Sequence, residues 1–83
     1  MTLDVLYFAW LRERIGESSE AVETEAATVA DLVNELRGRE ERYALAFSDL
    51  DSVRVAVDQD LVDFDAPLAG AREVAFFPPM TGG

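Results

Sequence analysis

The alternation of apolar and polar positions predicts a small set of strands. Residues 2–9 and residues 73–77 alternate and become apolar on both faces toward their ends, which is typical of central strands covered on two sides. Residues 53–57 alternate three valines with Arg54 and Ala56, a clear strand pattern. Residues 19–24 alternate weakly and are predicted to form an edge strand whose acidic residues face water. A brief strand is expected at residues 61–62.

One amphipathic helix is predicted to begin at Thr28, which can cap it, with Asp31 placed where a capping-box acid reaches back. Gly38 is its predicted end. The apolar residues that follow the cap at helical spacing form one stripe: Val29, Leu32, Val33 and Leu36.

Shorter helical segments are expected on either side of this helix. Residues 8–15 could form a short helix that Gly16 stops. Tyr43, Leu45 and Phe47 suggest a second short helical turn beneath the core.

This order of elements predicts an α+β fold, in which one main helix covers one face of a small mixed sheet. With the first and last strands at the centre, the arrangement is a β-grasp, or ubiquitin-like, roll. We expect residues 1–77 to form this domain and residues 78–83 to form an extended tail.

The sheet face opposite the helix is expected to carry Leu6, Phe8 and Phe77, with Leu61 near its rim. Small monomers seldom expose a contiguous apolar patch unless something binds there. The patch would adjoin the tail, because Pro78 follows Phe77 directly. Alternatively, residues 43–50 fold over this face and hide it.

The last residues carry the strongest functional signal in the chain. Pro78 and Pro79 form a stiff stem without N–H donors, which resists helix formation and cannot continue as a central strand. Met80 and Thr81 lead to Gly82 and Gly83, which lack a β-carbon and can thread a narrow channel. The pattern favours the carboxylate of Gly83 as the reactive group. A frayed, passive terminus is the alternative.

Composition narrows the candidate chemistry. The 83 residues make one domain, and they include neither Cys nor His, which argues against a thiol or imidazole nucleophile and against the usual zinc site. The net charge of −10 disfavours nucleic acid and would suit a partner with a basic face, or would only keep the protein in solution. No apolar run is long enough for a membrane span, and the chain is expected to be cytoplasmic. Asp58 and Asp60 could act in acid–base catalysis or bind Mg²⁺, but a turn explains the two residues better.

The ending from Phe76 to Gly83 resembles that of the MoaD-like sulfur carriers, the small subunits of molybdopterin synthase. The same family is resembled, in the same order along the whole chain, by residues 7–9, residues 11–13, residues 57–59 and residues 61–62. The sister family, the ThiS sulfur carriers of thiazole synthesis, shares the diglycine but usually lacks the Phe-Phe-Pro-Pro stem. Met80 stands where smaller residues are common, and the chain has no Lys where the family usually has some.

The resemblance implies a carrier that is not an enzyme by itself and binds no cofactor or metal. An E1-like adenylyltransferase would activate Gly83 with ATP and magnesium, and a sulfur donor protein would convert it to a thiocarboxylate. The tail, residues 78–83, would then enter the large subunit of molybdopterin synthase and pass sulfur to cyclic pyranopterin monophosphate, within a heterotetramer. By position, the docking residues of the family correspond to Phe8, Leu61 and Phe77.

Two other functions remain open at this point. A ubiquitin-like modifier would join Gly83 to lysines of target proteins after the same adenylation. A plain interaction module would have an inert tail, and its function would survive deletion of Gly83.

Overall fold

The computed structural model describes residues 1–79, which fold into a five-stranded sheet with the order β2-β1-β5-β3-β4. The strands and helices, in chain order, are β1 (Thr2–Tyr7), α1 (Trp10–Ile15), β2 (Ser19–Glu23), α2 (Val29–Arg39), α3 (Glu41–Ala46), a 3₁₀ turn (Leu50–Ser52), β3 (Arg54–Val57), β4 (Asp60–Val62) and β5 (Glu73–Phe77).

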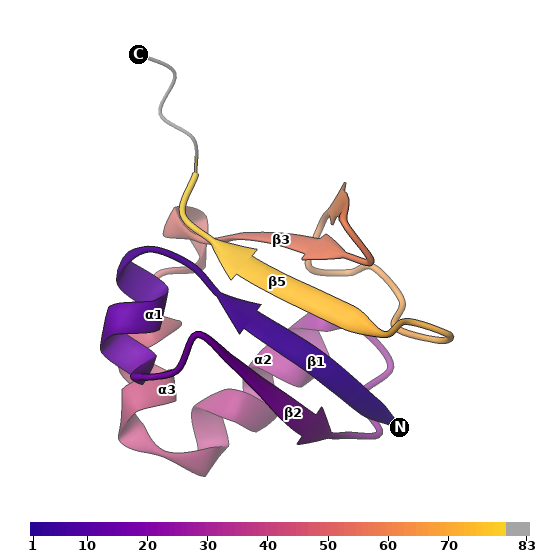
Figure 1. Cartoon of the computed structure of the whole chain (residues 1–83), viewed down its shortest axis with the longest axis horizontal. Coiled ribbons are helices and arrows are strands. Elements are labelled where there is room, and N and C mark those ends of the chain that lie inside the picture. Colours follow the sequence, from indigo (N-terminus) through magenta and orange to yellow (C-terminus); the bar gives the residue numbers. More distant parts are fainter. Residues whose placement is uncertain (80–83) are drawn as a thin grey trace.

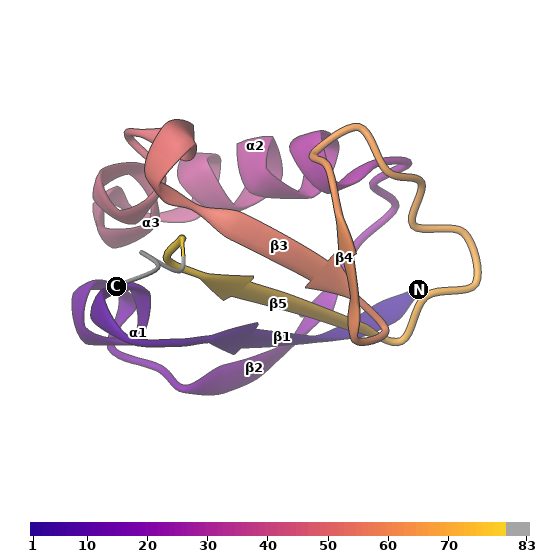
Figure 2. The same ribbon diagram turned by 90° about the horizontal axis from the view of Figure 1, so that it is seen from above.

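The first and last strands pair in parallel at the middle of the sheet, and every other strand pair is antiparallel. Figure 1 shows β5 between β1 and β3, with the arrows of β1 and β5 pointing to the same end of the molecule. Figure 2 shows α2 running along one side of the sheet. The predicted α+β class and the central position of the two doubly apolar strands are confirmed, and β2 lies at an edge as predicted.

The core lies between the sheet and the helices. It receives the helix-facing residues of β1 and β5, and the stripe predicted for α2 is fully buried. Phe76 is its centre: its ring stacks on Tyr7 at 6.2 Å between centroids and meets Phe47 edge-on at 5.0 Å. Such aromatic contacts add specific geometry to the burial of apolar area that drives folding.

The start of α2 is as predicted, but its end is not. The Thr28 hydroxyl accepts a hydrogen bond from the Asp31 amide at 3.2 Å, whereas the reciprocal bond from the Asp31 carboxylate is absent from the hydrogen bonds of residues 1–79. Gly38 lies inside the helix, which continues to Arg39. The reason is tertiary: the Arg39 guanidinium lies over the Tyr43 ring and 3.6 Å from the Glu20 carboxylate, and these contacts hold the last turn.

α1 begins at Trp10, two residues later than predicted, whereas α3 begins at Glu41, two residues before the predicted Tyr43. β1 ends at Tyr7 rather than Ala9, because Ala9 has a positive φ of 54° and turns the chain into α1. Tyr43 and Phe47 are buried as expected, whereas Leu45 points outward and is 56 % exposed. α3 packs against α1 and α2, so the alternative in which residues 43–50 cover the opposite face of the sheet is wrong.

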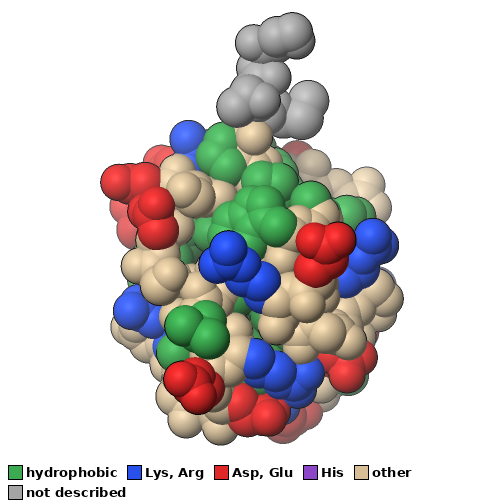
Figure 3. All heavy atoms as spheres, turned by 90° about the vertical axis from the view of Figure 1, so that its left-hand side faces the viewer, with side chains coloured by type: hydrophobic (Ala, Val, Ile, Leu, Met, Phe, Trp, Pro, Cys, Tyr) green, Lys and Arg blue, Asp and Glu red, His purple; other side chains and the backbone are tan. Residues whose placement is uncertain are grey.

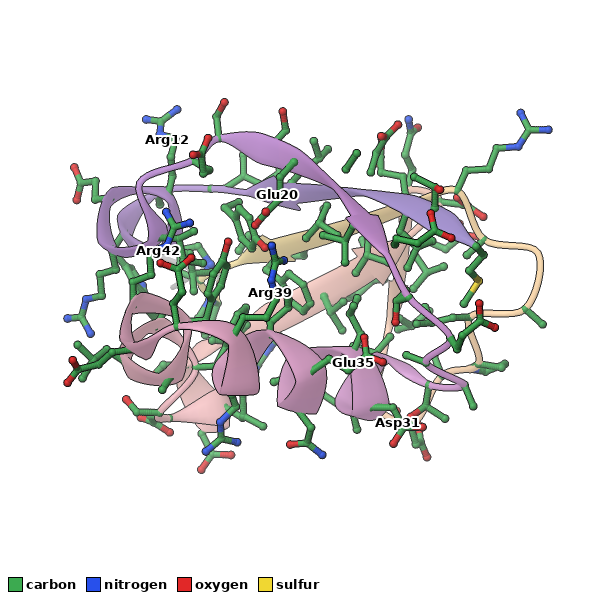
Figure 4. All side chains as sticks on the ribbon, turned by 90° about the horizontal axis from the view of Figure 1, so that it is seen from below. Arg12, Glu20, Asp31, Glu35, Arg39 and Arg42 are labelled. Atoms are coloured by element: carbon green, nitrogen blue, oxygen red, sulfur yellow. The ribbon has the colours of Figure 1, made fainter. Side chains whose placement is uncertain are left out.

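The carboxylate of Glu20, which was expected to face water on the edge strand, is instead half-buried and ties these helices to the edge of the sheet. Glu20 of β2 accepts hydrogen bonds from the hydroxyls of Tyr7, at 2.9 Å, and Tyr43, at 2.6 Å. In Figure 4, Glu20 lies between the strands and the helices, with Arg39 pointing toward it from α2. Burial, reinforced by the bond to Glu20, raises the pKa of Tyr43 to about 12 and raises that of Tyr7 further. The two hydroxyls therefore stay protonated donors at neutral pH.

We predict that alkaline pH unfolds the protein through these two tyrosines. A group whose pKa is higher in the folded state stabilises the fold below its unfolded pKa, which is about 10 for tyrosine, and loses that contribution as the pH rises further. The free energy of unfolding, measured with urea, should therefore fall from about pH 10 toward pH 12, by up to ~1.4 kcal/mol per pH unit for each tyrosine. The chain has no Lys or Cys, so few other side chains titrate in this window. Tyr43→Phe should flatten the slope, and an unchanged slope in that variant would contradict the assignment.

Candidate functional site

The face of the sheet that points away from the helices is apolar at one end. Strand alternation and register place Leu6, Ala75, Ala56 and Leu61 side by side across β1, β5, β3 and β4, in that order. Phe77 follows Ala75 on the same face, and Phe8 comes directly after β1. The structure thus confirms that no helix or loop among residues 1–79 covers this face.

These residues surround an open hollow, which we call the apolar hollow. Phe8, 47 % exposed, and the half-buried Phe77 stand at one side of it. The full lining comprises Leu6, Phe8, Ala56, Gln59, Glu73, Ala75, Phe77, Pro78 and Pro79. A concave surface of this composition can seat an apolar side chain of another protein.

The two alanines that floor the hollow were missed by the sequence interpretation. Ala56 and Ala75 share the outward parity of Leu6 and Phe77 in their strands, so the alternation pattern contained the signal. Their small side chains keep the surface concave between the larger residues around it.

Leu61 takes a different position from Phe8 and Phe77. It is 70 % exposed on β4 and lies on the same face, opposite Ala56, but it is not part of the lining of the apolar hollow. Phe8 and Phe77 therefore form one site with the stem, and Leu61 lies at the outer rim of the face.

The stem leaves the sheet directly beside this hollow. The Phe8 amide donates to the Phe76 carbonyl at 3.0 Å, which continues the pairing of β1 and β5 up to the stem. Pro78 and Pro79 then line the hollow themselves. Figure 3 shows hydrophobic side chains gathered at this end of the molecule, near the point where the described chain stops. Met80, Thr81, Gly82 and Gly83, which were predicted to carry the tail and its reactive carboxylate, lie outside the described residues.

The acids that could have suggested catalysis serve the fold. Asp58 and Gln59 have positive φ values of 49° and 73° and form the tight turn between β3 and β4. The Asp58 carboxylate accepts hydrogen bonds from the amides of Arg72 and Glu73, at 2.9 and 3.0 Å, and so fixes the start of β5. Residues 1–79 contain no group of three or more side chains placed to hold a metal ion. Within the same range, no helix is long and apolar enough to cross a bilayer.

The chain is similar to several known proteins over nearly its full length. The model of the ThiS family matches residues 5–83. The molybdopterin synthase sulfur carrier subunit of Escherichia coli is 43 % identical over 98 % of this chain and 99 % of that protein. A solved Pyrococcus furiosus protein described as subunit 1 of a molybdopterin converting factor has a TM-score of 0.73 and 30 % identity, covering 96 % of this chain and 99 % of that one. Small archaeal modifier protein 1 of Haloferax volcanii has a TM-score of 0.75 and 25 % identity, with all of both chains covered.

The two sides of the sheet should respond differently to truncation of an aromatic residue. Phe76 is fully buried, so Phe76→Ala should lower the free energy of unfolding by about 3–5 kcal/mol. Phe8 is half exposed, so Phe8→Ala should lower it by about 1 kcal/mol or less. Urea unfolding followed by circular dichroism measures both values, and a loss at Phe8 as large as that at Phe76 would place Phe8 in the core instead.

Proposed function

The chain belongs to the ThiS family, and we propose that, within this family, it is the sulfur carrier subunit of a molybdopterin synthase. The observation that carries the proposal is its 43 % identity with the Escherichia coli sulfur carrier subunit over almost the whole of both proteins. The apolar hollow beside the stem supports it, because a carrier must dock on its partner while its end enters the partner's active site.

The chemistry proposed for Gly83 follows from the nature of a carboxylate. This chemistry requires that Gly83 be the carboxyl terminus of the mature protein. A carboxylate is a poor electrophile, so an E1-like adenylyltransferase with bound ATP and Mg²⁺ joins it to AMP and releases pyrophosphate. Sulfide from a sulfur donor protein then attacks the acyl carbon and expels AMP, which leaves a thiocarboxylate. The transfer needs no cysteine on the carrier, and the chain has none.

The catalytic groups for the next step belong to the large subunit. The thiocarboxylate enters its active site, and sulfur passes to cyclic pyranopterin monophosphate, where two sulfurs form the dithiolene of molybdopterin. The carrier contributes a docking surface and an unhindered end: Phe8 and Phe77 contact the partner, and the stem from Pro78 directs the chain into it.

A protein modifier joined to lysines through Gly83 is the second candidate. The similarity to small archaeal modifier protein 1 favours it, because that relative shares the whole length of the fold with this chain. A ThiS-type carrier for thiazole synthesis is a third, since the matched family model bears that name. All three begin with activation of the same carboxylate, and they differ in what accepts the product.

Intact-mass spectrometry should detect the carrier chemistry directly. After incubation with the E1-like enzyme, ATP and a sulfide source, the mass should rise by the difference between one sulfur and one oxygen. A variant lacking Gly83 is the matched control and should not change. Conjugates in which Gly83 is linked to lysine amines of other proteins, with no thiocarboxylate formed, would instead support the modifier.

Truncating the apolar hollow should weaken binding to the large subunit without unfolding the carrier. Phe8→Ala and Phe77→Ala remove aromatic anchors, whose loss costs ~2 kcal/mol or more at interfaces, or about 30-fold in Kd. Isothermal titration calorimetry measures the change. Leu45→Ala is a suitable control, because Leu45 is 56 % exposed but lies on α3, on the helix side of the sheet. Unchanged affinity in both phenylalanine variants would move the docking surface elsewhere.

A further inference from the structure

Two carboxylates stand opposite each other on the uncovered face of the sheet. Asp4 of β1 and Glu73 of β5 are register partners in the central parallel pair. Both line a second, smaller hollow on this face, together with Leu6, Ser19, Glu20 and Ala21. Asp4 is exposed and Glu73 is half-buried. We call these two residues the acidic pair.

The acidic pair is unfavourable for the isolated fold. Like charges placed directly opposite on neighbouring strands destabilise a sheet. The salt bridges found among residues 1–79 involve neither carboxylate. The pairing of β1 with β5 keeps the two residues side by side, with the Asp4 amide donating to the Arg72 carbonyl at 2.9 Å, while the Glu73 amide donates to the Asp58 carboxylate at 3.0 Å. Asp58 thereby adds a third acid at the same end of β5.

The acidic pair borders the apolar hollow. Leu6 and Glu73 line both hollows, so the two are continuous on the surface. Glu73 lies two residues before Ala75, which along a strand is about 7 Å. An arginine or lysine of a partner that places an apolar side chain over Ala75 is long enough to reach the carboxylates from there.

We propose that the acidic pair receives a basic side chain of the same protein that accepts the tail, and that it sets the speed and orientation of docking. This inference rests on the proposed function, since it names the chemistry of the partner at that surface. The apolar hollow supplies most of the affinity, and the acidic pair supplies electrostatic steering. Formation of the complex relieves the repulsion between the two carboxylates, because the cationic side chain of the partner lies between them.

The double variant Asp4→Asn/Glu73→Gln tests this assignment, because it should make the fold more stable and its association with the partner slower. Its melting temperature should rise by ~1–4 °C, because removing a like-charge cross-strand pair stabilises a domain of this size. Its association rate with the molybdopterin synthase large subunit of the same organism, measured by stopped flow at low salt, should fall about 5–10-fold. At 0.5 M NaCl the difference from the unmodified protein should shrink to less than about twofold, because salt screens steering.

A control variant separates the position of the charges from their number. Asp31→Asn/Asp65→Asn removes the same two charges, from the first turn of α2 and from the loop after β4. At physiological salt of about 0.15 M, where the acidic-pair variant should still associate more slowly than the unmodified protein, the association rate of the control should stay within about twofold of the unmodified protein, because the Debye length of about 8 Å makes the steering field of a patch local. An equal slowing in both double variants would overturn the acidic pair as a specific feature and leave net charge as the cause.

The remaining outcomes separate this inference from the proposed function. If the unmodified protein binds the large subunit and Asp4→Asn/Glu73→Gln binds with the same rate and salt dependence, the acidic pair has no role in docking and only this inference fails. If the unmodified protein does not bind the large subunit at all, the proposed function fails and the inference fails with it. A lower melting temperature in the variant would show that the acids stabilise the fold and would also overturn the assignment.

Discussion

The parallel pairing of β1 with β5 is the constraint on which the rest of the structure depends. It joins the first strand to the last at the middle of the sheet, through the register that sets Asp4 beside Glu73 and Tyr7 beside Phe76. On one side this pairing assembles the aromatic core, because Phe76 meets Tyr7 from β1 and Phe47 from the helical side. On the other side it assembles the apolar hollow and brings Phe8 next to the stem. A shift of register by one residue would exchange these two faces and destroy both.

Alternate residues of β5 have different roles on the two faces of the sheet. Val74 and Phe76 are fully buried and stabilise the fold through the apolar area that they remove from water. Ala75 and Phe77 face outward, where the alanine keeps the surface concave and the phenylalanine keeps it apolar.

Local patterns in the sequence were sufficient to predict the strands and helices. The features that these patterns missed depend on contacts between residues far apart in the sequence. The Thr28 cap, the α2 stripe and the doubly apolar end strands are properties of a few neighbouring residues, and they were predicted correctly. Gly38 was expected to end α2, yet nothing lies within 4 Å of the place where its β-carbon would be, and Arg39 beyond it is held by Glu20. A glycine costs a helix about 1 kcal/mol, which such tertiary contacts can offset. The acidic pair could not be found in this way, because its members are 69 positions apart and only the register of the folded sheet makes them neighbours.

The stem shows why the end of this sheet is suited to presenting a chain rather than extending a strand. β5 has neighbours on both sides as far as Phe77, where it pairs with Arg54 of β3, and the Phe8 amide still bonds to Phe76 on the other side. Pro78 and Pro79 have no N–H to offer either neighbour, so the ladder ends there on both sides at once. Because β5 is a central strand, the chain leaves from the middle of the sheet rather than from an edge, with Phe8 and Phe77 beside it. A partner that contacts these two side chains therefore meets the outgoing chain at a fixed place, which is the geometric requirement for delivering a reactive end to an active site.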